Sequence, residues 1–238
     1  MRIVLLLLFT LSLLSCKQDN WGLMDRAFAY GDKGDYERAI RLLDRIIVNL
    51  NNEIESERRT SGIWLLYQDV HILRGIYKFN LGDTMGARKD YDYIVNFRKL
   101  RGNLPDPLAH FSRARLFRSQ EKYELAYLDI MQTYSHIRDA LDRGNIYMGL
   151  PGRLSRNIPL RFIQLERAVI YFGLDSLENA LDDINFCLTF ENLQDTAFYW
   201  RGKILLRQGD TINACADWRR IADLGLNSAR AKIERYCE

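Results

Sequence analysis

Five arginines recur in one sequence context and carry the most evident charge chemistry of the chain. Each stands before a small residue, and an alanine follows that small residue twelve positions later. In four of the five cases an aspartate comes three residues after the alanine, whereas the first case has Leu42 there. A guanidinium can hold a carboxylate through two parallel hydrogen bonds. We therefore expect structural ion pairs between each arginine and an aspartate of its own or an adjacent unit, with a ladder of arginines for an acidic ligand as the alternative. The arginines are Arg26, Arg74, Arg113, Arg167 and Arg201, and the aspartates are Asp90, Asp129, Asp183 and Asp217.

Residues for catalysis or metal binding do not form a recognisable set in the sequence. His71, His110 and His136 are never spaced as two ligands on one helical turn beside a carboxylate. The sequence also shows no serine or cysteine nucleophile motif and no glycine loop that would cradle a phosphate. We predict no catalysis, no metal and no cofactor, and we expect His71 and His110 to serve as packing side chains.

Three cysteines lie in the body of the chain. Cys187 falls on the apolar stripe of a predicted helix and is expected to be a buried, small apolar side chain. Cys215 opens one predicted helix and Cys237 closes the last one, and an antiparallel arrangement would bring these two ends together. The sequence is compatible with a disulfide between Cys215 and Cys237 and also with two free thiols.

The N-terminus has the pattern of an export signal. Arg2 precedes an apolar run at residues 3–14, which is shorter than the roughly 20 residues of a membrane span and typical of a signal peptide. The next two residues end the segment Leu13-Leu14-Ser15-Cys16, which resembles the bacterial lipobox. The resemblance implies a lipoprotein signal peptide at residues 1–15 and a lipid on Cys16, while a secretory signal without a lipid is the alternative.

The residues after Cys16 bear on where such a lipoprotein would reside. Several acyl chains on Cys16 would give a stable membrane anchor where one chain would not, and residues 16–20 would be the tether. Lys17, in place of an aspartate, favours the outer membrane of a Gram-negative envelope in proteins of this kind. We expect a lipid-anchored protein of the cell envelope.

The small residues mark pairs of helices. A bulky residue follows each second alanine by four positions and an apolar or nearly apolar residue follows by three more, which is the spacing of one helical stripe. A turn lies between the two small residues of each pair, openly in Gly34-Asp35, Gly82-Asp83 and Gly209-Asp210. Glycine can end one helix and aspartate can cap the next. The sequence therefore predicts antiparallel helix pairs that approach closely at the small residues.

This pattern resembles the tetratricopeptide repeat (TPR), which has small, small and bulky residues at these intervals. The resemblance implies an all-α, right-handed superhelical solenoid of about five helix-turn-helix repeats with a C-terminal capping helix. The family's proline at the end of each repeat is mostly missing here. The array would occupy residues 21–228, with repeats near 21–53, 68–101, 107–140, 161–194 and 195–228 and a capping helix at 227–238.

Two insertions interrupt the regular period. Residues 51–62 are polar and compatible with longer helices. Residues 141–160 contain three glycines and two prolines within GNIYMGLPGRLSRNIP and do not fit one regular helix. We interpret this second insertion as a tolerated surface segment, with an ordered functional loop as the alternative.

The composition excludes some classes of partner and fold. Without Arg2, 33 of the 34 lysines and arginines oppose 31 aspartates and glutamates, and these charges are spread along the chain. No basic stripe for nucleic acid follows from this. Four prolines and few runs of alternating Val, Ile and Thr argue against a sheet.

The function expected is that of a non-catalytic scaffold that binds a protein or peptide partner, because the first helices of such a stack line its concave groove. A subunit of an outer-membrane assembly or nutrient-uptake complex is an alternative, as is a purely structural role. An enzyme would need a site in residues 141–160, with Tyr147, Arg153 and Arg156 as its polar groups. Partner-binding candidates are Phe111, Arg115, Arg118, Phe162, Glu166, Tyr199, Trp200, Lys203 and Arg207.

Overall fold

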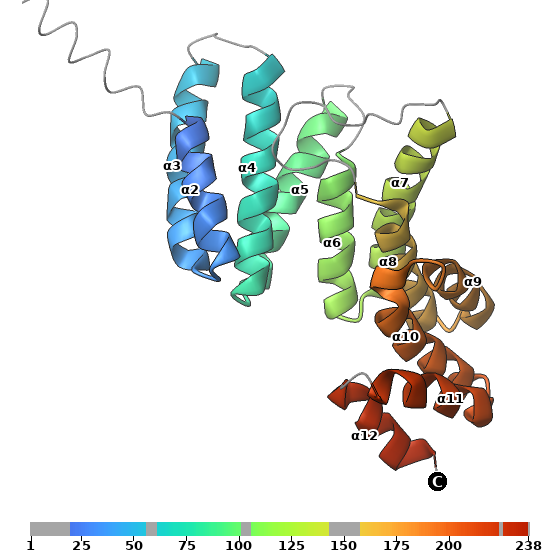
Figure 1. Cartoon of the computed structure of the whole chain (residues 1–238). Coiled ribbons are helices and arrows are strands. Elements are labelled where there is room, and N and C mark those ends of the chain that lie inside the picture. The colour runs from blue at the N-terminus through green and yellow to red at the C-terminus, as the bar shows by residue number, and fades with distance from the viewer. Residues whose placement is uncertain (1–19, 56–60, 101–105, 143–157, 224–225, 238) are drawn as a thin grey trace, which may run out of the picture. The chain divides into compact units, whose positions relative to one another are not determined.

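The described part of the chain is helical throughout. The computed structural model describes residues 20–55, 61–100, 106–142, 158–223 and 226–237, and these form eleven α-helices, one short 3-10 helix and no strand (Figure 1). This agrees with the predicted all-α class. The helices are α2 Asn20–Asp32, α3 Tyr36–Glu55, α4 Ser61–Asn80, α5 Thr84–Leu100, α6 Pro107–Ser119, α7 Tyr123–Asp142, α8 Leu160–Gly173, α9 Leu177–Cys187, α10 Gln194–Arg207, α11 Thr211–Ala222 and α12 Asn227–Tyr236, with the 3-10 helix η1 at Glu191–Leu193.

The helices divide between two compact units. Unit 1 holds α2 to α5, up to Phe97, and unit 2 holds α6 to α12. Within unit 1, α2 packs against α3 and α3 against α4. Within unit 2, α6 pairs with α7, α8 with α9 and α10 with α11, while α12 lies on α11. The first helices of unit 2 also touch each other, since α8 contacts both α6 and α10.

Each pair is closed by a turn with one residue in the left-handed region. Gly34, Gly82 and Gly209 have φ angles of 75°, 85° and 89°, whereas Glu121 and Asp175 take this role in the other two turns with φ of 58° and 59°. Glycine has no steric cost in this region. The turn signals in the sequence therefore correspond to real helix reversals, including the two that lack a glycine at the critical position.

The small residues lie where two helices cross. Gly202 on α10 faces Trp218 on α11, and a Cβ atom at Gly202 would come within 2.5 Å of the indole Nε1. Gly75 on α4 meets Tyr91 on α5 in the same way, again at 2.5 Å from a ring atom. Only glycine allows such close packing of a bulky ring. The paired alanines are fully buried, as Ala39 and Ala126 show.

The first insertion lengthens helices. Residues 51–55 belong to α3, and Ser61 begins α4. In the second insertion α7 extends to Asp142 and α8 begins at Leu160, so Tyr147, Arg153 and Arg156 lie outside the described residues.

The N-terminal predictions also fall outside the described residues, which begin at Asn20. The signal peptide, Cys16 and most of the tether are therefore not part of the structural account. Among the residues that are described, no helix is long and apolar enough to cross a membrane.

Candidate partner-binding surface

Four of the five recurrent arginines are bound by the aspartate of their own repeat. Arg113, Arg167 and Arg201 each donate from Nε to Oδ2 and from Nη2 to Oδ1 of the aspartate sixteen residues ahead, all at 2.7 Å. Arg74 binds Asp90 through the same two nitrogens. The carboxylates are buried. These arginines therefore hold helix pairs together and do not form a ladder for a ligand, while Arg26, whose repeat has Leu42, is exposed.

Two histidines join these ion pairs, which the sequence reasoning missed. His71 Nδ1 lies 3.2 Å from Asp90 Oδ1, and His110 Nδ1 lies 2.7 Å from Asp129 Oδ1. Both histidines are buried, as expected, but they are hydrogen-bonding groups as well as packing side chains. The sequence does contain a signal for this contact: each histidine precedes an arginine by three residues, which places the histidine and its arginine on the same face of one helix.

Burial and hydrogen bonding act against each other at the Asp90 carboxylate. Burial alone would raise the pKa of Asp90, but hydrogen bonds from His71, Arg74 and Lys78 favour the charged form and hold this pKa well below its usual range. For His71, burial has the larger effect, because it lowers the pKa of the imidazole more than the hydrogen bond to Asp90 raises it. The cluster is thus a neutral histidine and a charged carboxylate neutralised by cations.

A hollow lies between α6 and α8 in unit 2. It has a volume of about 400 Å³ and combines apolar side chains with one arginine and one glutamate. Four of its residues are among those predicted for partner binding, namely Phe111, Arg115, Phe162 and Glu166. The structure adds two that the sequence reasoning missed, Ile158 and Leu165.

Glu166 ties the edge of this hollow to α6. Its carboxylate accepts a hydrogen bond from Arg118 Nε, and Arg115 Nε lies 3.9 Å from its Oε2 atom. The Glu166 side chain is only 12% exposed, whereas Arg115 is 50% exposed. Arg118 is therefore engaged within the protein, and Arg115 is the more accessible cation at the rim.

The candidates on α10 form a second group with an aromatic residue of α8. Lys203 Nζ lies 3.8 Å from the ring centroid of Trp200, 4.9 Å from that of Phe172 and 6.0 Å from that of Tyr199. Burial, and then repulsion by Lys232 and Arg118, lowers the pKa of Lys203. We call Phe172, Tyr199, Trp200 and Lys203 the aromatic ledge.

Arg207 lies at the end of the same helix. Its Nε atom is 3.1 Å from Asp175 Oδ1, in a pair that is more than half exposed on both sides. Such an exposed pair contributes little stability and is easily exchanged for another partner.

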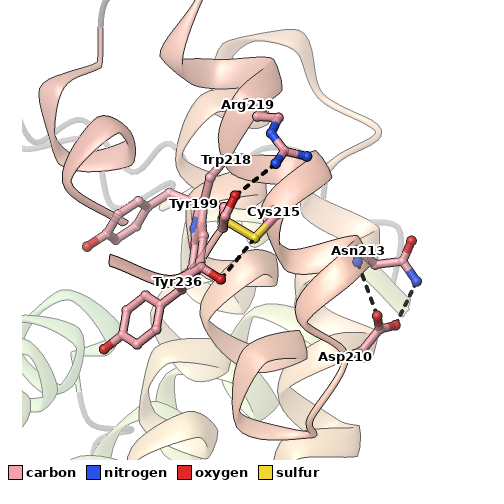
Figure 2. The surroundings of a disulfide bond; sticks show 8 residues. Tyr199, Asp210, Asn213, Cys215, Trp218, Arg219 and Tyr236 are labelled. Carbon is pink, nitrogen blue, oxygen red and sulfur yellow. Dashed lines mark hydrogen bonds between the residues drawn. A yellow bond between two sulfur atoms is a disulfide. The ribbon is translucent and has the colours of Figure 1, made fainter. Parts of the chain in front are cut away.

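A disulfide joins Cys215 on α11 to Cys237 at the end of α12 (Figure 2). Its Cα atoms are 5.6 Å apart. Beside it Trp218 donates from Nε1 to the Tyr199 carbonyl oxygen, and Arg219 Nη2 donates to the Cys237 carbonyl oxygen at 3.1 Å. The structure thus contains the bridge that the sequence left open. Cys187 is buried, and this burial raises the pKa of its thiol to about 12.

Solved structures identify the fold. No protein-family profile and no curated protein matches the sequence. A tetratricopeptide repeat protein from Parabacteroides merdae is similar, with 20% identity, a TM-score of 0.56 and coverage of 94% of this chain and 72% of that one. The fold is that of the tetratricopeptide repeat. MamA from Desulfovibrio magneticus RS-1 has 14% identity, a TM-score of 0.57 and coverage of 87% and 96%. A chain of the APC/C hetero-tetramer Cut9–Hcn1 has 13% identity, a TM-score of 0.68 and coverage of 97% and 38%.

In this TPR fold the predicted partner-binding residues all lie on α6, α8 and α10, the first helices of three pairs in unit 2. Contacts between α8 and its two neighbours bring them onto adjoining helices. The described residues contain no group of three His, Cys, Asp or Glu side chains placed to hold a metal ion. What the arrangement offers is apolar area, aromatic rings and accessible charge, which are the elements of a binding surface.

Proposed function

We propose that this chain is a non-catalytic TPR scaffold, anchored to the cell envelope through a lipid on Cys16, that binds a segment of a protein partner on the first-helix face of unit 2. The observation that carries the proposal is the hollow between α6 and α8, with apolar walls from Phe162 and Leu165 and charge at its rim. A volume of about 400 Å³ is suited to a large apolar side chain of a partner.

The TPR fold itself supports a scaffold role. Stacked helix pairs leave an extended surface along their first helices, and here that surface carries a hollow on α6 and α8 and an aromatic ledge on α8 and α10. A dedicated subunit of an outer-membrane assembly or uptake complex is the more specific form of the same proposal. It requires one constant partner, whereas a general scaffold binds several.

Site-specific photocrosslinking in living cells tests the proposal. A benzophenone amino acid introduced at Phe111 or Tyr199 should capture the same partner, whereas one at Leu128, 62% exposed on α7, should not. Placing a carboxylate in the hollow by Leu165→Glu should reduce the Tyr199 adduct at least fivefold, because it introduces an unpaired charge into a largely apolar site.

Leu128→Glu is the matched control and should leave the adduct unchanged. Identical adducts from Phe111 and Leu128, or a Tyr199 adduct that survives Leu165→Glu, would contradict binding at this surface. Capture of one constant partner in every growth condition would favour the dedicated subunit.

A further inference from the structure

We propose that the segment bound by unit 2 is acidic, with an apolar side chain that enters the hollow and carboxylates that reach Lys203 and Lys232 beside the aromatic ledge. This inference rests on the proposed function and names the chemistry of its partner. It follows from which lysines and arginines on this face have a carboxylate partner and which do not.

Most cations on the first helices of unit 2 have a carboxylate of their own. Arg113, Arg167 and Arg201 are held by buried aspartates, Arg118 binds Glu166, and Arg207 pairs with Asp175. Lys203 has no such partner among the described residues, since its contacts there are to three aromatic rings. On α12, Lys232 likewise contacts a ring, that of Tyr236 at 5.5 Å, and has no carboxylate partner in the described parts.

A chain of contacts joins Lys232 on α12 to the aromatic ledge. Lys232 lies over the ring of Tyr236, the centroid of this ring is 6.1 Å from that of Trp218, and Trp218 Nε1 donates to the Tyr199 carbonyl oxygen. Burial lowers the pKa of Lys203, and repulsion by Lys232 and then by Arg118 acts in the same direction. The Cys215–Cys237 disulfide holds the end of α12 against α11 and so keeps Lys232 in place. A carboxylate entering here would gain attraction from two unpaired lysines in a partly desolvated setting.

The aromatic ledge adds area for the same segment. Trp200 and Phe172 lie edge to face, with ring centroids 5.7 Å apart, and Tyr199 meets Trp200 in the same way at 6.0 Å. The ledge and the hollow adjoin the same apolar core, since Phe162 and Leu165 of the hollow and Phe172 and Trp200 of the ledge all pack against it. One extended segment can therefore place an apolar side chain in the hollow and carboxylates at the lysines.

A continuous polyanion fits this face less well than a peptide. Glu166 stands at the hollow and Asp175 is largely exposed beside Arg207. A membrane surface or a phosphate backbone presents negative charge along its whole length and would place some of it against these carboxylates, whereas a peptide can place apolar side chains there and its acidic side chains at the lysines.

Selection from a random dodecapeptide display library on the full chain in detergent tests the inference. We expect the selected peptides to be enriched in aspartate and glutamate and to contain an apolar residue among the acids. A selected peptide, labelled and measured by fluorescence anisotropy at low salt, should bind Lys203→Gln and Lys232→Gln at least about fivefold more weakly. Arg230→Gln is the control, because Arg230 is an exposed cation on the same helix as Lys232.

Each outcome bears on a different claim. Selected peptides without acidic enrichment, or binding that is equally weak in Arg230→Gln, would overturn the inference and leave the proposed function standing. A selection that yields no binding peptide at all would overturn the proposed function itself. Lysine-dependent binding to phosphatidylglycerol vesicles that exceeds binding to the peptides would also overturn the inference, in favour of an anionic surface. Circular dichroism of both variants should match the parent chain, and Lys232→Gln alone suffices if Lys203→Gln alters the fold.

Discussion

The Arg–Asp pairs are the residue-level feature that decides the stability of each repeat. Asp183 is buried, and its two oxygens each accept one hydrogen bond from Arg167. A buried charge without its partner is costly, whereas an apolar pair of similar size is often tolerated. The pair therefore matters most when only one of its members is removed.

We predict that Arg167→Met lowers the free energy of unfolding by about 3 kcal/mol, because it leaves the Asp183 carboxylate buried and unpaired. Urea unfolding followed by circular dichroism measures the change. Arg26→Met is the control, since Arg26 is exposed and its repeat has Leu42 in place of the aspartate; it should change the stability by less than about 0.5 kcal/mol. Adding Asp183→Leu to Arg167→Met should restore most of the loss, and failure to do so would show that the pair's charge is not the cause.

Burial of His71 and the hydrogen bonds of the Asp90 carboxylate make unit 1 sensitive to acid. The folded protein lowers the pKa of His71 below its ordinary value of 6.5, so it contributes stability that is complete above pH 6.5 and is lost as the pH falls. Asp90 has a lowered pKa too, and its contribution is present above its ordinary value of 3.8 and is lost below it. Acid therefore destabilises unit 1 in two successive steps.

We predict that His71→Gln removes the first step. A glutamine can still donate a hydrogen bond to Asp90 but does not titrate. Between pH 7 and pH 5 the urea midpoint of the parent chain should fall, whereas that of His71→Gln should stay nearly constant; the loss below pH 4 should remain in both. An unchanged slope between pH 7 and pH 5 in His71→Gln would assign this step to another group.

At the level of elements, the disulfide contributes most to the stability of α12. This helix contributes Ala229 as a fully buried residue and packs Ile233 and Tyr236 against the core that contains Trp218. A helix of 10 residues has little stability without such packing. The Cys215–Cys237 bridge closes a loop of 22 residues and limits the freedom of the unfolded terminus.

We predict that Cys237→Ala loosens α12 while the earlier helices of unit 2 stay folded. Amide hydrogen exchange in α12 should become at least tenfold faster, and α8 and α9 should keep their protection. Reduction of the parent chain should give the same pattern, and a reducing agent should change nothing further in Cys237→Ala. Equal acceleration in α8 would show that the bridge stabilises the whole unit and not this helix alone.

At the scale of the whole molecule, the proposed anchor and the proposed binding surface lie in different parts of the chain. Cys16 comes before α2 in the sequence, while the hollow and the aromatic ledge belong to unit 2. Loss of the anchor should therefore change where the protein resides without changing the fold or the binding surface.

We predict that Cys16→Ser abolishes incorporation of labelled palmitate and moves the protein from the membrane fraction to the soluble one, since the proposed attachment consists of the acyl chains on Cys16. Cys187→Ser is the control for an unrelated cysteine and should keep the label. A Cys16→Ser protein that still carries labelled lipid would contradict the lipobox interpretation. Peptide binding by the released protein should match that of the anchored one.

The sequence alone determined the features that depend on local spacing. The buried stripe that contains Ala39 and Leu43 and the turn at Gly82 follow from a helical period that repeats within each pair of helices. The sequence also predicted that the arginines form ion pairs, and the structure showed that Arg113 binds the aspartate of its own pair, Asp129. The stripe and the turn lie within a single helix hairpin, so the order of residues along two adjacent helices is enough to predict them.

The tertiary structure decided what depends on helices from different pairs. The spacing along α6, α8 and α12 did not reveal that Glu166 binds Arg118, that Ile158 and Leu165 line the hollow, or that Lys232 lies over Tyr236. Whether a cation is engaged internally or available to a partner is fixed by the neighbouring pair and by the disulfide that holds α12. The sequence of one pair contains no measure of those distances, because they arise only when successive pairs pack side by side.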